Sequence, residues 1–253
     1  MKADDYIREV LSKYTKENKP RTLLLQEIEK FIGKIRGWAG EVLHSISFSG
    51  SYFKGTYLSG IDDIDLLISL DLRTQGTLNE IYNNLFNYLQ SENYSPFKNE
   101  FSIGVVDSGF SFDLMPSFKN FNSATGDILI SCKNNKCIQT NIDAHNKLIL
   151  NSGKLNEIIA IKIWRNLNRL KFPTLYLELC VLDALHRSSK NQLAKNFIAI
   201  IEYFLEFFMD TKITDPVNSQ NIISDLLIQE EKTLIVQAAQ ETRNRANWAD
   251  IIW

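Results

Sequence analysis

The sequence contains little of what marks several large classes of protein. Only 3 of its 253 residues are cysteine, an odd and small number that does not supply the disulfide framework of a secreted domain. Its longest apolar stretch, at 197–209, is interrupted by Glu202 and Glu206 and is shorter than the roughly 18 residues that a membrane span needs. The opening residues MKADDYIREV lack the apolar core of a signal peptide. We therefore expect a cytoplasmic protein with no membrane partner.

The sequence also lacks an excess of charge of either sign. Its 28 Lys and Arg residues nearly balance 30 Asp and Glu residues, which leaves a formal net charge of −2. This balance argues against a protein that binds nucleic acid through its overall electrostatic field, although a local basic groove remains open. A hydrophobic content of 44% is typical of a folded domain, and 253 residues are enough for one large domain or two small ones.

Hydrophobic periodicity divides the sequence into a mixed half and a helical half. Strand-like runs lie in the first half at 46–49, 64–70, 101–106 and 110–114. Helical patterns precede and separate these runs, and from residue 141 the helical period continues to the end. We therefore expect an α+β fold, with a mixed-sheet domain and its N-terminal helices at 1–140 and an all-helical domain at 141–253. No Gly/Ser linker separates the halves, so we expect a cleft between them.

One segment of the first half carries residues suited to phosphate and metal chemistry. Gly50 and Ser51 follow a predicted strand and begin a helical turn, where backbone N–H groups and a hydroxyl can bind phosphate. Asp63 and Asp65 are two residues apart on the next predicted strand, so their carboxylates lie on the same face. Such carboxylates repel each other unless a cation lies between them, and Mg²⁺ binds carboxylates together with substrate phosphates.

A third carboxylate lies on a later predicted strand. Phe110, Phe112 and Leu114 alternate as buried residues, which puts Asp113 on the opposite face. Three carboxylates are enough for two ions, of which one serves the attacking hydroxyl and the other serves the triphosphate and the leaving pyrophosphate. The sequence therefore predicts a site for two divalent ions, Mg²⁺ or Mn²⁺.

These motifs resemble those of the DNA polymerase β-type nucleotidyltransferases. The resemblance is carried by Gly50-Ser51, Gly55-Thr56, Asp63-Ile64-Asp65 and Asp113-Leu114-Met115-Pro116. It is greatest to the branch that contains archaeal CCA-adding enzymes, 2′-5′ oligoadenylate synthases and the bacterial cyclic-oligonucleotide (CD-NTase) synthases. Weaker likenesses follow at 140–145, 158–166, 176–178 and 215–218.

The resemblance implies a polymerase β-like core, followed by a helical domain, and a role for each matched residue. Asp63, Asp65 and Asp113 would be catalytic and would bind the two metal ions. The nucleotide would be bound by Gly50, Ser51, Lys54, Thr56, Lys162 and Tyr176. Among these, Ser51 and Lys162 would contact the triphosphate, and Tyr176 would stack on the base or hydrogen-bond the triphosphate. Lys54 would face solvent or the phosphates.

The resemblance further implies a template-independent nucleotidyltransferase that uses nucleoside triphosphates, foremost ATP, and releases pyrophosphate. A chain of 253 residues leaves no room for the RNA-binding domains of the CCA-adding enzymes. We therefore favour a bacterial anti-phage signalling synthase whose acceptor or product is an oligonucleotide, cyclic or linear, sensed by a downstream effector protein. Two alternatives stay open: an enzyme that transfers a nucleotide to an antibiotic, a protein or a tRNA end, and a catalytically silent nucleotide-binding module.

Some of the singled-out residues also have purely structural interpretations. Lys162 has the alternative of a solvent-facing helix lysine, and Asp215 is better explained as the cap of a turn before Pro216. Cys132, Cys137 and His145 have the spacing of a partial zinc site. A structural zinc ion requires four ligands, so we expect an ordinary hairpin there.

Overall fold

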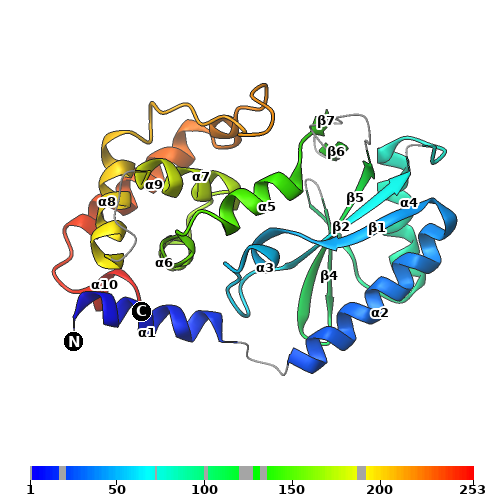
Figure 1. The fold of residues 1–253 in the computed structure, drawn as a ribbon, viewed down its shortest axis with the longest axis horizontal. Coiled ribbons are helices and arrows are strands. Elements are labelled where there is room, and N and C mark those ends of the chain that lie inside the picture. Colours follow the sequence, from blue (N-terminus) through cyan, green and yellow to red (C-terminus); the bar gives the residue numbers. More distant parts are fainter. Residues whose placement is uncertain are drawn as a thin grey trace. The chain divides into compact units, whose positions relative to one another are not determined.

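The computed structural model describes residues 2–16, 21–71, 73–99, 102–119, 128–131, 136–186 and 192–253. The chain folds as two compact units (Figure 1). The sheet unit is Glu17–Lys147, and the helical unit combines Met1–Lys16 with Leu148–Trp253. Each unit has its own set of packed helices or strands.

The described residues form a mixed sheet of seven strands, with helices before, between and after these strands in the sequence. The strands are β1 (Leu43–Phe48), β2 (Ile64–Asp71), β3 (Phe97–Lys98), β4 (Ile103–Asp107), β5 (Phe110–Lys119), β6 (Ile128–Ser131) and β7 (Lys136–Gln139). The α-helices are α1 (Ala3–Thr15), α2 (Arg21–Ala39), α3 (Gly50–Lys54), α4 (Leu78–Ser91), α5 (Ile142–Leu150), α6 (Leu155–Leu167), α7 (Thr174–Ala184), α8 (Leu193–Glu206), α9 (Gln229–Arg243) and α10 (Trp248–Ile251). Short 3-10 helices lie at Gly40–Val42 and Ile223–Leu226.

The strand order of the sheet is β1-β2-β5-β4-β3, and β6 and β7 continue from β5. Strands β2 and β5 are parallel, whereas the other neighbouring pairs are antiparallel. Strands β4 and β5 are joined by a tight turn, in which Ser108 and Gly109 both adopt positive φ and Asp107 pairs with Phe110. The predicted hairpin at 128–139 is present as the pair β6 and β7, and its connecting residues 132–135 lie outside the described residues.

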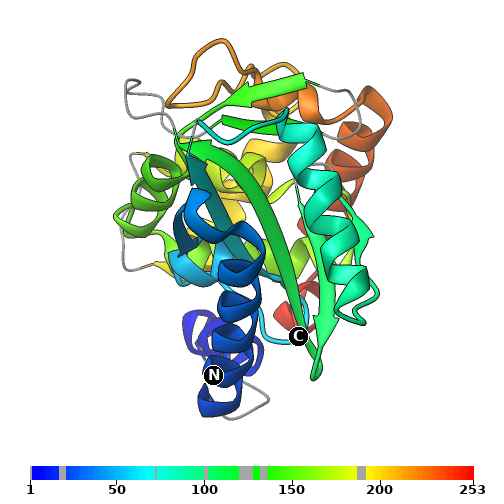
Figure 2. The same ribbon diagram turned by 90° about the vertical axis from the view of Figure 1, so that its right-hand side faces the viewer.

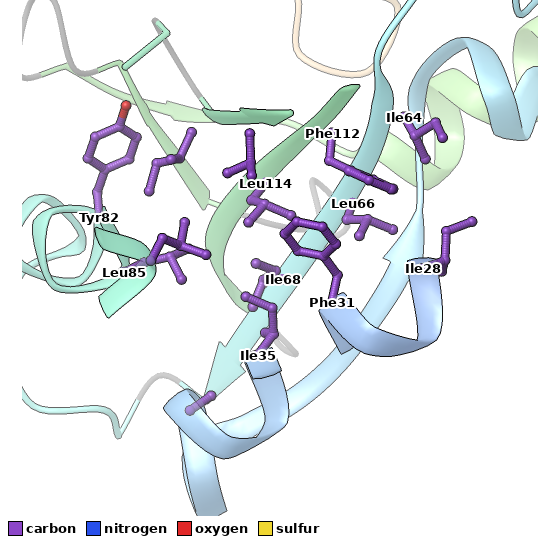
Figure 3. Close-up of a cluster of buried hydrophobic side chains, with 14 of the residues drawn as sticks. Ile28, Phe31, Ile35, Ile64, Leu66, Ile68, Tyr82, Leu85, Phe112 and Leu114 are labelled. Atoms are coloured by element: carbon purple, nitrogen blue, oxygen red, sulfur yellow. The ribbon is translucent and has the colours of Figure 1, made fainter. Parts of the chain in front are cut away.

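One face of the sheet is covered by helices α2 and α4, which lie side by side over it (Figure 2). Their apolar side chains meet those of β2, β4 and β5 in one buried cluster (Figure 3). Phe31 of α2 lies against Phe112 of β5, with ring centroids 4.6 Å apart. Burial of such aromatic side chains contributes roughly 2 kcal/mol each. This core fixes which side chains of β2 and β5 point away from the helices.

The opposite face of β2 and β5 carries matched pairs of residues. Leu67 lies in register with Met115, and both pack against Ile142 of α5. The next pair along the strands is Ser69 and Ser117, whose hydroxyl groups are 3.3 Å apart and hydrogen-bonded. The beginning of α5 therefore belongs to the sheet unit.

The helical unit packs α1 with helices from the C-terminal half of the chain. Ile7 of α1 is completely buried. Asp4 accepts a hydrogen bond of 2.8 Å from the backbone N–H of Ala194 at the start of α8. The Tyr6 hydroxyl donates to the Ile252 carbonyl at 3.1 Å. Among the described residues, no helix combines the length and the apolar character needed to cross a bilayer.

The two units differ from the expected ranges 1–140 and 141–253 at two places: the N-terminal helix and the boundary near residue 140. Helix α1 is part of the helical unit because its buried face and its hydrogen bonds are made there. The later boundary falls after Lys147, because Ile142 packs on the sheet. Periodicity along the sequence reports that a segment is helical but not which partner covers its apolar face.

Candidate active site

Two of the predicted carboxylates lie side by side at the centre of the sheet. Asp65 of β2 and Asp113 of β5 are direct partners in the parallel register, on the face opposite the helix-covered core. Asp63 lies two residues before Asp65, just ahead of β2. Burial raises the pKa of both Asp65 and Asp113, and the negative charge of Asp63 adds to this effect. The structure thus pairs Asp65 with Asp113 on neighbouring strands, and Asp63 lies directly before β2.

Gly50 allows the turn after β1 to approach Asp65 closely. Ser49, the residue before α3, donates its backbone N–H to the Asp65 carbonyl at 2.9 Å. Gly50 has φ of +59°, and a Cβ atom at this position would lie 1.7 Å from Oδ2 of Asp65. Only glycine fits here, because both the backbone angle and the nearby carboxylate exclude a side chain. The missing side chain of Gly50 therefore leaves room for the Asp65 carboxylate.

The remaining residues predicted around this turn are buried. Ser51 and Lys54 of α3 are 6% and 5% exposed, and Thr56 is fully buried. The Thr56 N–H donates to the Ser51 carbonyl at 3.0 Å, which closes the turn after α3. Of the two directions expected for Lys54, the direction toward solvent is wrong, because the side chain is buried and its positive charge lowers the pKa of Asp65. The direction toward the phosphates stays a prediction.

Burial and like charge both favour the protonated forms of the central acids. Burial and the charge of Asp113 raise the pKa of Asp65 to about 7, against the opposing positive charge of Lys54. Burial and the charge of Asp63 raise the pKa of Asp113 to about 6, while hydrogen bonds from Ser102 and Asn99 oppose this. A positive charge at this point of the sheet would therefore be strongly stabilised.

The donor set fits hard divalent cations such as Mg²⁺ or Mn²⁺. Carboxylate oxygens from neighbouring strands are the ligands that these ions take, and the mutual repulsion of the acids is relieved by a cation. Among the described residues, no three His, Cys, Asp or Glu side chains are already arranged to hold a metal ion. The acids would therefore have to turn toward a common ion when it binds.

Lys162 and Tyr176 lie in the helical unit, and both are completely buried. The alternative of a solvent-facing Lys162 is therefore wrong. The Tyr176 ring stacks on Phe208 and meets Phe172 edge-on, with centroid distances of 5.3 Å in both cases. Its hydroxyl has no hydrogen-bond partner among the described residues, and burial raises its pKa. Nucleotide contacts by these two residues stay predictions.

Two further expectations concern the turn cap at Asp215 and the partial zinc site. The Asp215 side chain accepts hydrogen bonds from the Val217 N–H at 2.8 Å and from the Asn221 amide at 3.2 Å. This confirms that Asp215 caps a turn. The partial zinc site cannot be placed, because Cys132 and the side chain of Cys137 lie outside the described residues.

Sequence reasoning missed two residues that contact Asp113. Asn99 donates from its side-chain amide to Oδ1 of Asp113 at 3.0 Å, and the Ser102 hydroxyl is a second hydrogen-bond partner of this carboxyl. Asn99 directly follows β3, a strand of only two residues that leaves no alternation in the sequence, and Ser102 directly precedes β4. No signal in the sequence alone connects them to Asp113.

Comparisons with known proteins rest on structure, because no protein-family model and no curated protein matches the sequence. A structure of CdnC from E. coli MS115-1 with ATP has a TM-score of 0.76 and 19% identity, over 93% of this chain and 88% of that chain. The Bradyrhizobium diazoefficiens CD-NTase CdnG in complex with GTP has a TM-score of 0.73 and 15% identity, over 94% and 90%. The Elizabethkingia meningoseptica CdnE cyclic dinucleotide synthase, with GTP and Apcpp, has a TM-score of 0.64 and 14% identity, over 97% of this chain and 100% of that chain.

These likenesses extend over nearly the whole chain, so they include the sheet unit and the helical unit alike. The predicted α+β class is confirmed by the mixed sheet and by these neighbours. The chain therefore has the same fold as CdnC, as CdnG, which is described as a CD-NTase, and as CdnE, which is described as a cyclic dinucleotide synthase.

Proposed function

We propose that this protein is a template-independent nucleotidyltransferase that joins nucleotides from nucleoside triphosphates and releases pyrophosphate. The observation that carries this proposal is the pair Asp65 and Asp113, in register on parallel strands, with Asp63 directly before β2 and the Gly50 turn against Asp65. Two adjacent acids with raised pKa values are costly for the fold, and such groups are concentrated at functional sites.

In the proposed reaction, an acceptor hydroxyl attacks the α-phosphorus of the triphosphate. The bond to the bridging oxygen breaks, and pyrophosphate leaves. Asp63, Asp65 and Asp113 would hold two divalent ions, which supply charge neutralisation to the phosphates. The Asp113 carboxylate would orient the attacking hydroxyl and accept its proton. Ser51 and the backbone of its turn would hold the terminal phosphates, so catalysis is mainly positioning.

We further propose that the product is a signalling oligonucleotide, cyclic or linear, made for anti-phage defence. Support comes from the fold neighbours, since CdnE is described as a cyclic dinucleotide synthase and CdnG is in complex with GTP. The neighbour CdnC is also known in a complex with a HORMA protein. By analogy, ATP and GTP are the first substrates to test, and a downstream effector protein would respond to the product.

A product assay tests the proposed activity. The purified protein is incubated with the four ribonucleotides or the four deoxynucleotides and with Mg²⁺ or Mn²⁺, and products are identified by mass spectrometry. We expect pyrophosphate and an oligonucleotide from the wild type, and neither from the double variant Asp63→Ala/Asp65→Ala. Equal product from this variant would exclude these acids as the catalytic group.

The same assay separates the alternatives. An enzyme that modifies an antibiotic, a protein or a tRNA end would turn over only after that acceptor is added, and the acceptor would gain the mass of a nucleotide. A silent binding module would bind the triphosphate with metal but release no pyrophosphate under any of these conditions.

A further inference from the structure

The carboxyl group of Asp113 is held by two neutral donors from one short segment. The Asn99 amide donates to Oδ1 at 3.0 Å, and the Ser102 hydroxyl is the second partner. The same Asn99 amide lies 3.3 Å from the Ser102 hydroxyl oxygen, so the two donors also contact each other. Two hydrogen bonds restrict the rotation of a carboxylate that is otherwise free to turn about its χ angles.

Both donor residues, Asn99 and Ser102, are fixed to the core of the sheet unit. The Asn99 N–H donates to the Ser102 carbonyl at 2.9 Å. The hydroxyl of Tyr82 on α4 donates to the same Ser102 carbonyl at 2.8 Å and approaches the Asn99 carbonyl at 3.3 Å. Tyr82 is 1% exposed, and Figure 3 shows its hydroxyl directed away from the packed side chains of the cluster. Helix α4 therefore sets the position of both donors.

Building on the proposed function, we propose that Asn99 and Ser102 are positioning residues that orient the Asp113 carboxylate for a divalent cation. An amide and a hydroxyl orient a carboxylate without neutralising it, whereas a lysine or arginine would compete with the cation for its charge. Partners that orient a metal ligand in this way typically affect metal affinity or activity by about 10-fold to 100-fold.

A purely structural role for the two donors leads to a different expectation. Donors that only satisfy a buried carboxylate would contribute to stability, and their loss would lower the melting temperature without a specific effect on metal binding. Metal affinity, measured directly and well below the melting temperature, therefore distinguishes the two roles.

The test is a titration of the full chain with Mn²⁺ alone, followed by electron paramagnetic resonance of free Mn²⁺, for the wild type, Asn99→Ala and Ser102→Ala. The matched control is Asn83→Ala, since Asn83 on α4 donates to the Asn79 carbonyl at 2.9 Å and accepts from Lys98 at 2.6 Å. We expect about 10-fold weaker Mn²⁺ binding for Asn99→Ala, a smaller loss for Ser102→Ala and no change for the control. The Mn²⁺ concentration for half-maximal turnover should shift by the same factor, with little change in KM for ATP.

The outcomes separate this inference from the proposed function. A wild type that neither binds Mn²⁺ nor turns over nucleotide would overturn the proposed function and, with it, this inference. A wild type that binds Mn²⁺, with unchanged affinity in Asn99→Ala and Ser102→Ala, would overturn the positioning role alone. If Asn99→Ala does not fold, Ser102→Ala and Tyr82→Phe decide the question, because each removes only one hydroxyl group.

Discussion

Asp65 shows how a single residue can be costly to the fold and useful to the site. Burial raises its pKa from 3.8 to about 7, so the folded protein holds a proton on Asp65 over a pH range in which the unfolded chain has lost it. The free energy of unfolding therefore falls as the pH rises through this range, and the full penalty is present above pH 7. A bound cation would remove the penalty by stabilising the ionised carboxylate.

We predict that Asp65→Asn stabilises the metal-free protein at pH 8 by roughly 1–3 kcal/mol and abolishes nucleotidyl transfer. The gain should shrink as the pH is lowered to 5, where the wild-type carboxyl is protonated. Thermal unfolding in the presence of a chelator measures both effects. The control is Asp71→Asn, because hydrogen bonds from Arg73 lower the pKa of Asp71 and its loss should not stabilise the protein at pH 8. An Asp65 variant less stable than the wild type at pH 8 would contradict the argument.

Two crowded glycines of the sheet unit, Gly50 and Gly104, should differ in how much stability they lose on replacement by alanine. Gly50→Ala places a Cβ 1.7 Å from Oδ2 of Asp65 at a positive φ, so we expect a loss of roughly 1–3 kcal/mol and at least about 100-fold lower activity. Gly104→Ala places its Cβ 2.2 Å from the tip of the Phe97 ring. That ring is 45% exposed and can swing outward, so the loss should stay below about 1 kcal/mol. Urea unfolding of both variants tests this contrast, and similar losses would contradict it.

At the scale of elements, the parallel pair of β2 and β5 decides the geometry of the site. Its register places Asp65 beside Asp113 and, two residues further on, Leu67 beside Met115. Alternation in the sequence predicts on which face each acid lies, because the strand period is two. It does not predict which strands are neighbours, and the parallel pairing of β2 with β5 is therefore known only from the structure.

Helix α4 connects the core to this site, and its N-terminal cap can be tested. Thr77 and Glu80 form a reciprocal capping box, in which Glu80 N–H donates to the Thr77 hydroxyl at 3.2 Å and Thr77 N–H donates to the Glu80 carboxylate at 2.6 Å. We predict that Thr77→Ala lowers the free energy of unfolding by about 1 kcal/mol, whereas Thr77→Ser lowers it by much less. Chemical denaturation checks both, and equal losses would argue against a role for the hydroxyl.

At the scale of the whole molecule, the first helix and the C-terminal half depend on each other. Ile7 is completely buried, and Tyr6 and Tyr14 donate to the carbonyls of Ile252 and Trp253. We predict that Ile7→Ala destabilises the helical unit by about 2–4 kcal/mol, whereas Lys13→Ala at an exposed position of α1 changes stability by less than about 0.5 kcal/mol. Hydrogen exchange should show lost protection in α6 and α8 for Ile7→Ala. Unchanged protection there would contradict this packing.

Much of the fold follows from the sequence, and the limits of prediction have physical causes. The strands around Ile64 and Phe112 and the helix from Leu78 are visible in their periodicity, because one face of each is covered by a single core. The acids of the site could be identified from local spacing. The inward direction of Lys54 and the contact of Asn99 with Asp113 could not, because both depend on tertiary packing, which local spacing does not report.

We propose above that the acids on β2 and β5 perform nucleotidyl transfer. The most direct measurement is the release of pyrophosphate from ATP and GTP, with identification of the nucleotide product, for the wild type and the nearly isosteric variants Asp65→Asn and Asp113→Asn. We predict stoichiometric pyrophosphate and oligonucleotide from the wild type, and a loss of at least about 1,000-fold in each variant that still binds nucleotide. Turnover that survives in folded Asp65→Asn and Asp113→Asn would contradict it.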